Sequence, residues 1–226
     1  MKPTILAVDT AHGICSAALW REGAVAAFIH YAEPAKQAER LLPIIESMLE
    51  KEKLTYGALT HLVSTTGPGS FTGLRVGLAA ISGIHIATGI PAAGLSTLQT
   101  LAWRGLHHEH IKTGMIASVI DAHRGQAYLQ LFTNQQKFPV AASEPILVEL
   151  ADVATHLTAK DCTLFGNIAV LSGSTAATLE LSEKNLPDAT DAAEMAAALL
   201  ARGETLAPAL PLYIRGPDAK LPKKRI

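Results

Sequence analysis

The stretch TTGPGSFTGLRVGLAAISG, Thr65–Gly83, is a glycine–proline turn that runs into an apolar segment with helical character. We predict a helix over Phe71–Thr88. This helix contains Gly73, Gly77 and Gly83. Each internal glycine costs a helix about 1 kcal/mol relative to alanine. Because glycine has no side chain, we expect this cost to be offset by another backbone that packs closely against the helix.

The turn before this helix limits the kind of site that it can form. Pro68 fixes its own φ and Gly69 tolerates a positive φ, so we predict a type II turn over Gly67–Ser70. Ser70 is expected to cap the helix. The segment matches neither a Walker A loop, nor G-x-G-x-x-G, nor the G-x-S-x-G of a hydrolase. A structural turn is therefore favoured over a phosphate-binding loop, although the free amides at a helix start leave an anion site open.

One side of the predicted helix is suited to close packing. Small or aliphatic residues recur there at helical spacing: Gly73, Gly77, Ala80 and Ile84. Such a face allows another backbone to approach closely. An apolar pattern over Ala35–Lys51 predicts a second helix nearby in the sequence. We therefore expect an association surface built from both helices, with the neighbour in the same chain or in another one.

A strand–turn–strand pattern occurs twice in the chain. One apolar strand ends at Asp9 and its turn contains Gly13; another ends at Asp121 and its turn contains Gly125. The spacing is the same in both places, and apolar strands flank both turns. We therefore predict an internal repeat that produces two similar α/β halves.

A polar, histidine-rich stretch over 103–112 separates these halves. We predict an N-terminal lobe over residues 1–104, which holds the two helices, and a C-terminal lobe with a basic tail over residues 105–226. The cations of the tail are Lys220, Lys223, Lys224 and Arg225. They indicate either a solvated chain end or an arm that touches RNA phosphate or an acidic partner, and the sequence leaves both open.

Composition excludes several classes of protein. The 226 residues carry a formal net charge of −1, so there is no overall attraction to nucleic acid or anionic lipid. The two cysteines, far apart in the sequence, fit a reducing cytosol, and we expect a cytoplasmic protein. Val76–Leu95 has no charged residue and is long enough to span a membrane. Because Gly89 and Pro91 interrupt it, we expect a buried helix followed by a buried strand, and no membrane partner.

Candidate chemistry is limited to the two strand ends. A carboxylate at such a turn can orient a metal-bound phosphate or a water, so Asp9, Thr10 and Asp121 are the possible nucleotide-facing residues. The alternative is that these aspartates stabilise their turns through nearby amides. The cluster of histidines and glutamate over 107–110 lacks the spacing of a helical ligand pair. We therefore predict no metal site and assign no catalytic residue.

Five segments carry a resemblance to a known family: ILAVDTAHGICSAALW, GPGSFTGLRVGLAAISGI, GLSTLQTLA, DAHRGQAY and PLYIRGPDAKLP. Together they resemble the bacterial TsaB (YeaZ) family of tRNA threonylcarbamoyladenosine biosynthesis proteins. The resemblance covers nearly the whole chain. It is most specific in GPGSFTGLR and loose over residues 144–184.

The resemblance implies an α/β fold of the actin, sugar-kinase and heat-shock-ATPase (ASKHA) class, built from two duplicated lobes. It implies a non-catalytic subunit that forms a heterodimer with its catalytic paralogue TsaD and works with the ATPase TsaE. That complex transfers a threonylcarbamoyl group to the adenosine beside the anticodon of tRNA. ATP is used by the wider complex, and no cofactor is assigned to this chain. The resemblance also implies a homodimer when the chain is alone.

The resemblance places the partner surface on the two predicted helices. The expected interface residues are Leu41, Leu42, Ile45, Phe71, Gly73, Leu74, Arg75, Gly77, Ala80, Ile81 and Ile84. Among them Arg75 is either a polar anchor at the rim or an ordinary solvated arginine. Many relatives carry a histidine where this chain has Ala38, a departure that bears on the interface and on no catalytic residue.

A second class of function stays open. A nucleotide-dependent phosphotransferase of the same fold would use Asp9, Asp121 and the glycine turn, but the sequence shows no complete phosphate-binding signature. The sequence also leaves open the strength of the homodimer, nucleotide binding by the chain itself, and contact between the basic tail and tRNA.

Overall fold

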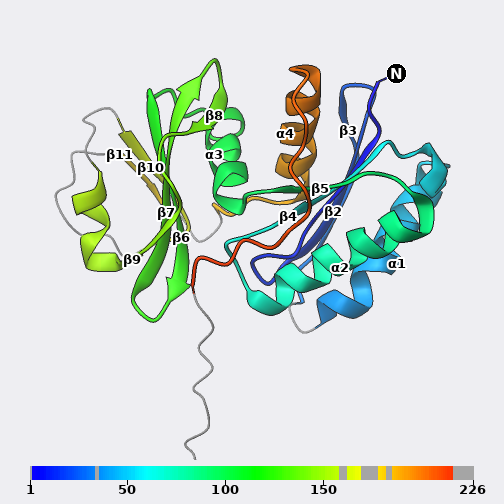
Figure 1. The fold of residues 1–226 in the computed structure, drawn as a ribbon, viewed down its shortest axis with the longest axis horizontal. Coiled ribbons are helices and arrows are strands. Elements are labelled where there is room, and N and C mark those ends of the chain that lie inside the picture. Colours follow the sequence, from blue (N-terminus) through cyan, green and yellow to red (C-terminus); the bar gives the residue numbers. More distant parts are fainter. Residues whose placement is uncertain (1, 34–35, 158–161, 169–177, 182–184, 216–226) are drawn as a thin grey trace, which may run out of the picture.

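The computed structural model describes residues 2–33, 36–157, 162–168, 178–181 and 185–215. Two β-sheets lie side by side with helices packed against them (Figure 1). The predicted tail cations Lys220–Arg225 lie outside the described residues.

The first sheet has the strand order β3-β2-β1-β4-β5. Its strands are β1 (Ile5–Asp9), β2 (Cys15–Arg21), β3 (Ala24–Tyr31), β4 (His61–Thr65) and β5 (Ala92–Leu95). The first three form an antiparallel meander, and β4 and β5 continue parallel to β1. Central strand β1 is fully buried, because helices cover both faces of this sheet.

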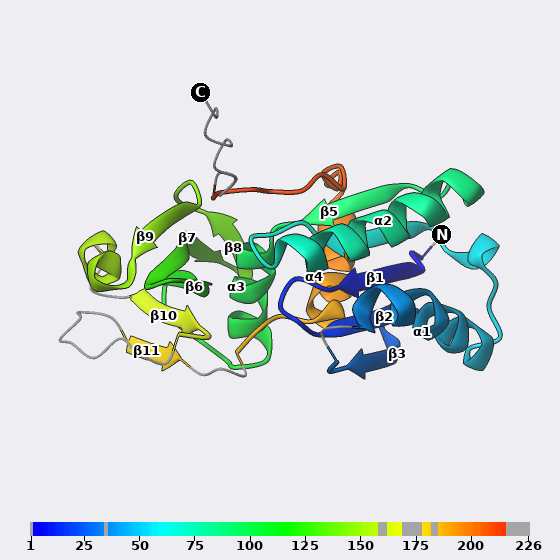
Figure 2. The ribbon, with the colours of Figure 1, turned by 90° about the horizontal axis from the view of Figure 1, so that it is seen from below.

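Helices α1 (Gln37–Lys51) and α2 (Phe71–Thr88) cover one face of the first sheet, and α4 (Ala189–Ala201) covers the other (Figure 2). A short 3₁₀ helix, Tyr56–Ala58, leads into β4. Side chains alternate along β1 as a strand requires. Leu6 and Val8 pack with α1 and α2, whereas Ile5 and Ala7 pack with α4.

The second sheet has the strand order β11-β10-β6-β7-β8, with β9 paired to β7. Its strands are β6 (Met115–His123), β7 (Gln126–Gln135), β8 (Phe138–Ala141), β9 (Ile146–Glu149), β10 (Cys162–Gly166) and β11 (Thr178–Leu181). Helix α3 (Thr97–His107) packs against it through Leu98, Leu101 and Leu106. A 3₁₀ segment, Leu150–His156, follows β9.

The two sheets repeat one plan, which confirms the predicted duplication. In each, an antiparallel meander of three strands is extended on the far side of its first strand by two parallel strands. The glycines of the two first turns share a positive φ, 78° at Gly13 and 77° at Gly125, a region that glycine adopts at the least cost. The turns themselves differ, because β1 ends at Asp9 as predicted, whereas β6 continues past Asp121 to His123.

The contacts do not follow the predicted division at residues 104 and 105. Helix α3, most of which belongs to the predicted first range, packs on the second sheet. Helix α4, from the second range, packs on the first sheet against Ile5, Ala7 and Val63. A linear division fails here because the chain crosses between the sheets before α3 and returns with α4.

The histidine-rich stretch is also more structured than a polar linker. Helix α3 continues through His107, whose ring stacks on Trp103 with 3.8 Å between the ring centroids. Its Nε2 lies 2.8 Å from the carbonyl oxygen of Lys137.

A neighbouring backbone packs against the glycines of α2, as expected, but it belongs to the turn between β1 and β2 of the same lobe and not to α1. A Cβ added at Gly73 would lie 2.1 Å from the carbonyl oxygen of Thr10. At Gly77 it would lie 2.6 Å from the Thr10 hydroxyl and 3.0 Å from the Ser64 hydroxyl. Gly83 faces open space. Two of the three glycines are thus required by the turn between β1 and β2.

The predicted type II turn over Gly67–Ser70 is wrong, because that turn requires a positive φ at Gly69, and the structure has the positive φ, 113°, at Gly67 instead. The predicted cap is confirmed: the Ser70 side chain accepts a hydrogen bond from the Gly73 amide at 3.3 Å.

Helix α2 is, within the described part of the chain, the one helix that is long and apolar enough to cross a membrane. Core helices of soluble proteins pass the same test. Here the face that carries Gly73, Gly77 and Ile81 is buried against the first sheet, so α2 is a structural part of its lobe.

Two alanine substitutions test the role of these glycines. Gly73→Ala places a methyl group against a buried backbone oxygen and should destabilise the fold by about 3 kcal/mol or more. Gly83→Ala meets no neighbour and should stabilise the helix by up to about 1 kcal/mol. Denaturant unfolding monitored by circular dichroism measures both. Equal effects of the two substitutions would contradict the packing described here.

Candidate functional site

A groove of about 520 Å³ runs between α1 and α2 on the outer face of the first lobe. Its lining residues are Ala38, Leu41, Leu42, Phe71, Thr72, Arg75, Val76, Ala79 and Ala80. Leu42 is 44% exposed and Phe71 is 55% exposed, both high fractions for large apolar side chains. Exposed apolar surface at a groove marks a site of interaction.

The structure divides the predicted interface residues into two groups. Those that a partner can reach are Leu42, Phe71, Arg75 and Ala80, and Leu41 forms the groove floor although it is almost fully buried. The others lie in the core of the lobe: Ile45, Gly73, Leu74, Gly77, Ile81 and Ile84. These six are corrected from surface to core, because the apolar stripe of each helix packs on the sheet beneath it.

A three-residue stack forms one rim of the groove. The guanidinium carbon of Arg75 lies 3.8 Å from the centroid of the Phe71 ring. Arg75 Nε donates to the Tyr213 hydroxyl at 3.4 Å, and the rings of Phe71 and Tyr213 are 5.5 Å apart. Arg75 is therefore a positioned rim residue. Tyr213 lies in the segment PLYIRGPDAKLP, which carries part of the family resemblance, but no helical or strand pattern there indicates a contact with α2.

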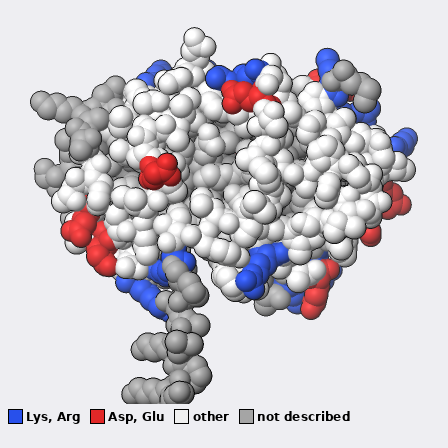
Figure 3. All heavy atoms as spheres, viewed as in Figure 1, with Lys and Arg blue, Asp and Glu red and all other residues white. Residues whose placement is uncertain are grey.

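The surface over α2 carries little charge. Arg75 is the only Lys, Arg, Asp or Glu in α2, and in Figure 3 the charged side chains in this part of the molecule lie along its lower edge. Small side chains, Ala38, Ala79 and Ala80, line the groove between its larger residues. This combination suits an apolar helix of another protein, because small residues allow a close approach and aromatic and arginine side chains contribute strongly to interfaces.

The possible nucleotide-facing residue Asp9 is 2% exposed at the end of β1. Its carboxylate accepts hydrogen bonds from the Thr65 hydroxyl and from the Ala11 amide. Burial raises the pKa of Asp9 to about 7, against the lowering effect of these two hydrogen bonds, and the charge of Asp188 raises it further. The geometry is that of a turn-stabilising aspartate.

The hydroxyl and carbonyl groups of Thr10 also have hydrogen-bond partners within the lobe. Its hydroxyl donates to the Gly73 carbonyl at 2.7 Å and accepts from the Gly77 amide at 3.1 Å. Its carbonyl accepts from Gln37 Nε2 at 3.3 Å, and the same amide group donates to the Ile14 carbonyl at 2.8 Å. Gln37 therefore ties the start of α1 to this turn, a role that the sequence analysis missed.

Asp121 lies in a different setting from Asp9. Its side chain is 40% exposed, and its Oδ1 accepts from the His123 amide at 2.7 Å. The Asp121 amide donates to Asn167 Oδ1 at 2.9 Å. The two aspartates thus share a place in the duplicated plan without sharing an environment.

Comparison with known structures defines the class of the fold. The chain superimposes on an inorganic polyphosphate/ATP-glucomannokinase from Arthrobacter with a TM-score of 0.51 at 8% identity, covering 88% of this chain and 99% of that one. Together with the duplicated sheets, this places the chain in the ASKHA class, as the resemblance implied. At 8% identity, this similarity shows only that the two folds are alike.

Closer relatives define the family. The family model of TsaD, tRNA N6-adenosine threonylcarbamoyltransferase, matches residues 34–206. A structure of YeaZ from Pseudomonas aeruginosa superimposes with a TM-score of 0.80 at 28% identity, covering 93% of this chain and 99% of that one. TsaB of Bacillus subtilis is 33% identical over 70% of this chain and 67% of its own length. The chain belongs to the TsaB (YeaZ) family within the TsaD group of proteins.

The match to TsaB of Escherichia coli is 36% identical over 55% of this chain and spans about half of that relative, 52% of its length. Both curated relatives carry the name tRNA threonylcarbamoyladenosine biosynthesis protein.

The buried carboxyl group of Asp9 should make the stability of the fold depend on pH. Its pKa of about 7 lies above the unfolded value of 3.8, so the native state binds more protons between these values and wild-type stability falls as pH rises through that window. Asp9→Asn has no charge to bury. We expect the stability of this variant relative to wild type to increase from pH 4 to pH 7.5, measured by urea unfolding. A difference that stays flat, or that matches the exposed control Asp152→Asn, would contradict this account.

Proposed function

We propose that the chain is the non-catalytic subunit of a threonylcarbamoyl-transfer complex, in which it binds a TsaD homologue through the α1–α2 groove. The complex would modify the adenosine next to the anticodon of tRNAs. Family membership supports the pathway. The observation that carries the subunit role is the exposed apolar groove, in which Leu42 and Phe71 stay accessible although the core of the lobe is complete.

The same groove is the proposed surface for self-association, so the homodimer and the heterodimer would exclude one another. A TsaE homologue would supply ATPase activity, tRNA would be bound through the complex, and the setting would be the cytoplasm. No cofactor is assigned to this chain. The TsaD-group family match supports a partner of related fold.

The alternative, a nucleotide-dependent phosphotransferase, receives less support from the geometry. Asp9 and Thr10 are both almost fully buried, and the polar groups of both are bound by α2 or by the adjacent strand. Calorimetry with ATP and magnesium distinguishes the two functions. Tight binding and hydrolysis by this chain alone would favour the phosphotransferase.

The groove is tested by placing a charge in it. Leu42→Glu and Ala79→Glu should each weaken binding to the TsaD homologue by about tenfold or more, because an unpaired carboxylate would be buried. Both side chains are exposed in the single chain, so the fold should stay intact. Calorimetric titration measures the dissociation constant, and sedimentation measures the homodimer.

The matched control is Ala201→Glu, an exposed helix position on the opposite face of the sheet. It should leave both associations unchanged. The proposal fails if the wild-type pair does not associate, or if the two groove variants bind as tightly as the control.

A further inference from the structure

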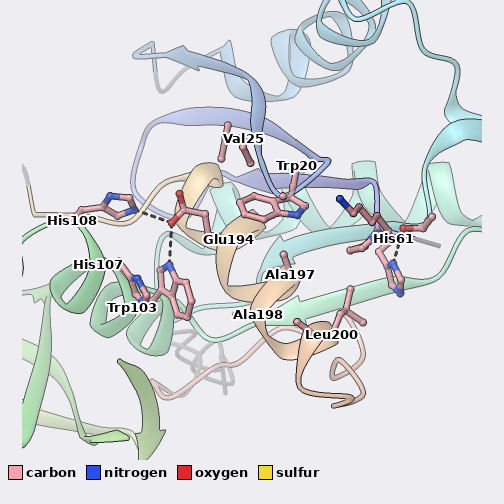
Figure 4. Close-up of a pocket in the computed structure, with 16 residues that line it drawn as sticks. Trp20, Val25, His61, Trp103, His107, His108, Glu194, Ala197, Ala198 and Leu200 are labelled. Carbon is pink, nitrogen blue, oxygen red and sulfur yellow. Dashed lines mark hydrogen bonds and ion pairs between the residues drawn. The ribbon is translucent and has the colours of Figure 1, made fainter. Parts of the chain in front are cut away.

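A second and larger cavity, of about 1130 Å³, lies on the other face of the first sheet, beside α4 (Figure 4). Its apolar lining includes Trp20, Val25, Ala197, Ala198 and Leu200. Trp103 and His107 of α3, and His108 directly after this helix, close one end. Because α3 packs on the second sheet and α4 on the first, this end of the cavity lies where the two lobes meet.

A fixed carboxylate stands at that end. Glu194 is 22% exposed, and its Oε2 accepts a hydrogen bond from Trp103 Nε1 at 3.2 Å. The same oxygen lies 2.9 Å from His108 Nε2. Figure 4 shows Glu194 beside Trp103 and His108, with Trp20 between this end and His61. A carboxylate held by two neighbours against an aromatic wall is suited to bind a cation.

Three carboxyl groups at this end of the cavity share two basic partners. Arg104 lies 3.1 Å from Asp191 and 3.6 Å from Asp188, and His108 is the ion-pair partner of Glu194. Asp191 is fully buried, and its Oδ1 lies 3.5 Å from His108 Nε2 without a hydrogen bond among the described residues. Burial, followed by the charge of Asp188, raises the pKa of Asp191 to about 7. Near neutral pH Asp191 therefore carries only part of a negative charge, and Glu194 is the carboxylate of this cluster that lines the cavity.

The opposite end of the cavity has the reverse character. Lys2 lines it, together with Thr60 and His61, whose Oγ1 and Nδ1 lie 2.9 Å apart. A cationic ligand group would be repelled by Lys2 and attracted by Glu194. The lining therefore fixes the orientation that such a ligand would take.

We propose that this cavity binds an amphipathic organic cation, with its hydrophobic body on the Trp20, Val25 and Leu200 wall and its ammonium or guanidinium group on Glu194. The volume of about 1130 Å³ is slightly above the usual range of about 300–1,000 Å³ for small-molecule sites. The site is separate from the α1–α2 groove, since it lies on the other face of the sheet.

The chain provides its own reporter for this binding. It contains two tryptophans, Trp20 and Trp103, and both line the cavity, so tryptophan fluorescence reports on this site alone. Three probes of one shape separate charge from hydrophobicity: phenethylamine, phenethyl alcohol and phenylacetate. We expect saturable fluorescence changes in the affinity order amine, alcohol, acid. A capped leucyl-arginine amide tests whether a basic peptide side chain is a better source of the cation than a free amine.

Two variants test separately where the charged group and the hydrophobic body of the ligand bind. Glu194→Gln keeps an acceptor for Trp103 and should weaken the amine about tenfold while leaving the alcohol unchanged. Ala198→Leu fills the cavity without touching the ion cluster and should weaken both probes. Glu50→Gln, an exposed glutamate on α1, is the matched control and should change neither.

Two results would overturn the proposal: the amine binding no more tightly than the alcohol to the wild-type chain, or Glu194→Gln binding the amine as tightly as the control does. Leu42→Glu, which tests the groove, should leave amine binding unchanged. Failure of this site and failure of the proposed subunit role are therefore distinguishable.

Discussion

The first lobe depends on the contact between Thr10 and the start of α2. The Thr10 hydroxyl bridges the Gly73 carbonyl and the Gly77 amide, and both glycines must lack a side chain for the turn to reach the helix. The contact joins the first strand pair to the helix that follows β4. It also explains why a helix with three internal glycines is stable, because two of them lie where a methyl group would meet buried oxygen atoms.

This contact has two consequences for function. It seats α2 so that its glycine face is buried, which leaves the opposite face with Phe71, Arg75 and Ala79 to line the groove beside α1. It also occupies Thr10, while Thr65 and the Ala11 amide occupy Asp9. The turn that a phosphotransferase would need for its nucleotide is thereby used to hold the lobe together.

On the other face of the first sheet, the surface is shaped by the way in which the two lobes exchange helices. Helix α3 packs on the second sheet, α4 packs on the first, and Arg104, Asp188 and Asp191 form the polar contact between them. Burial of these charges requires mutual pairing, because an unpaired charge in the interior is costly. The cavity beside Glu194 is therefore lined by residues of α4 on one side and by residues of α3 at one end.

The helices over Ala35–Lys51 and Phe71–Thr88, the duplicated halves and the family could be predicted from the amino-acid sequence. These predictions follow from local periodicity, from the equal Asp–Gly spacing of the two turns, and from motifs that are continuous in the chain. Which residues of α1 and α2 are surface and which are core became known from the folded chain. A small-residue stripe shows that something packs closely, but not what does so, and here it is the Thr10 turn. The Arg75–Tyr213 contact joins residues 138 positions apart, and such pairs depend on the path of the whole chain. The same reason applies to α4, whose packing on the first sheet no local pattern could indicate.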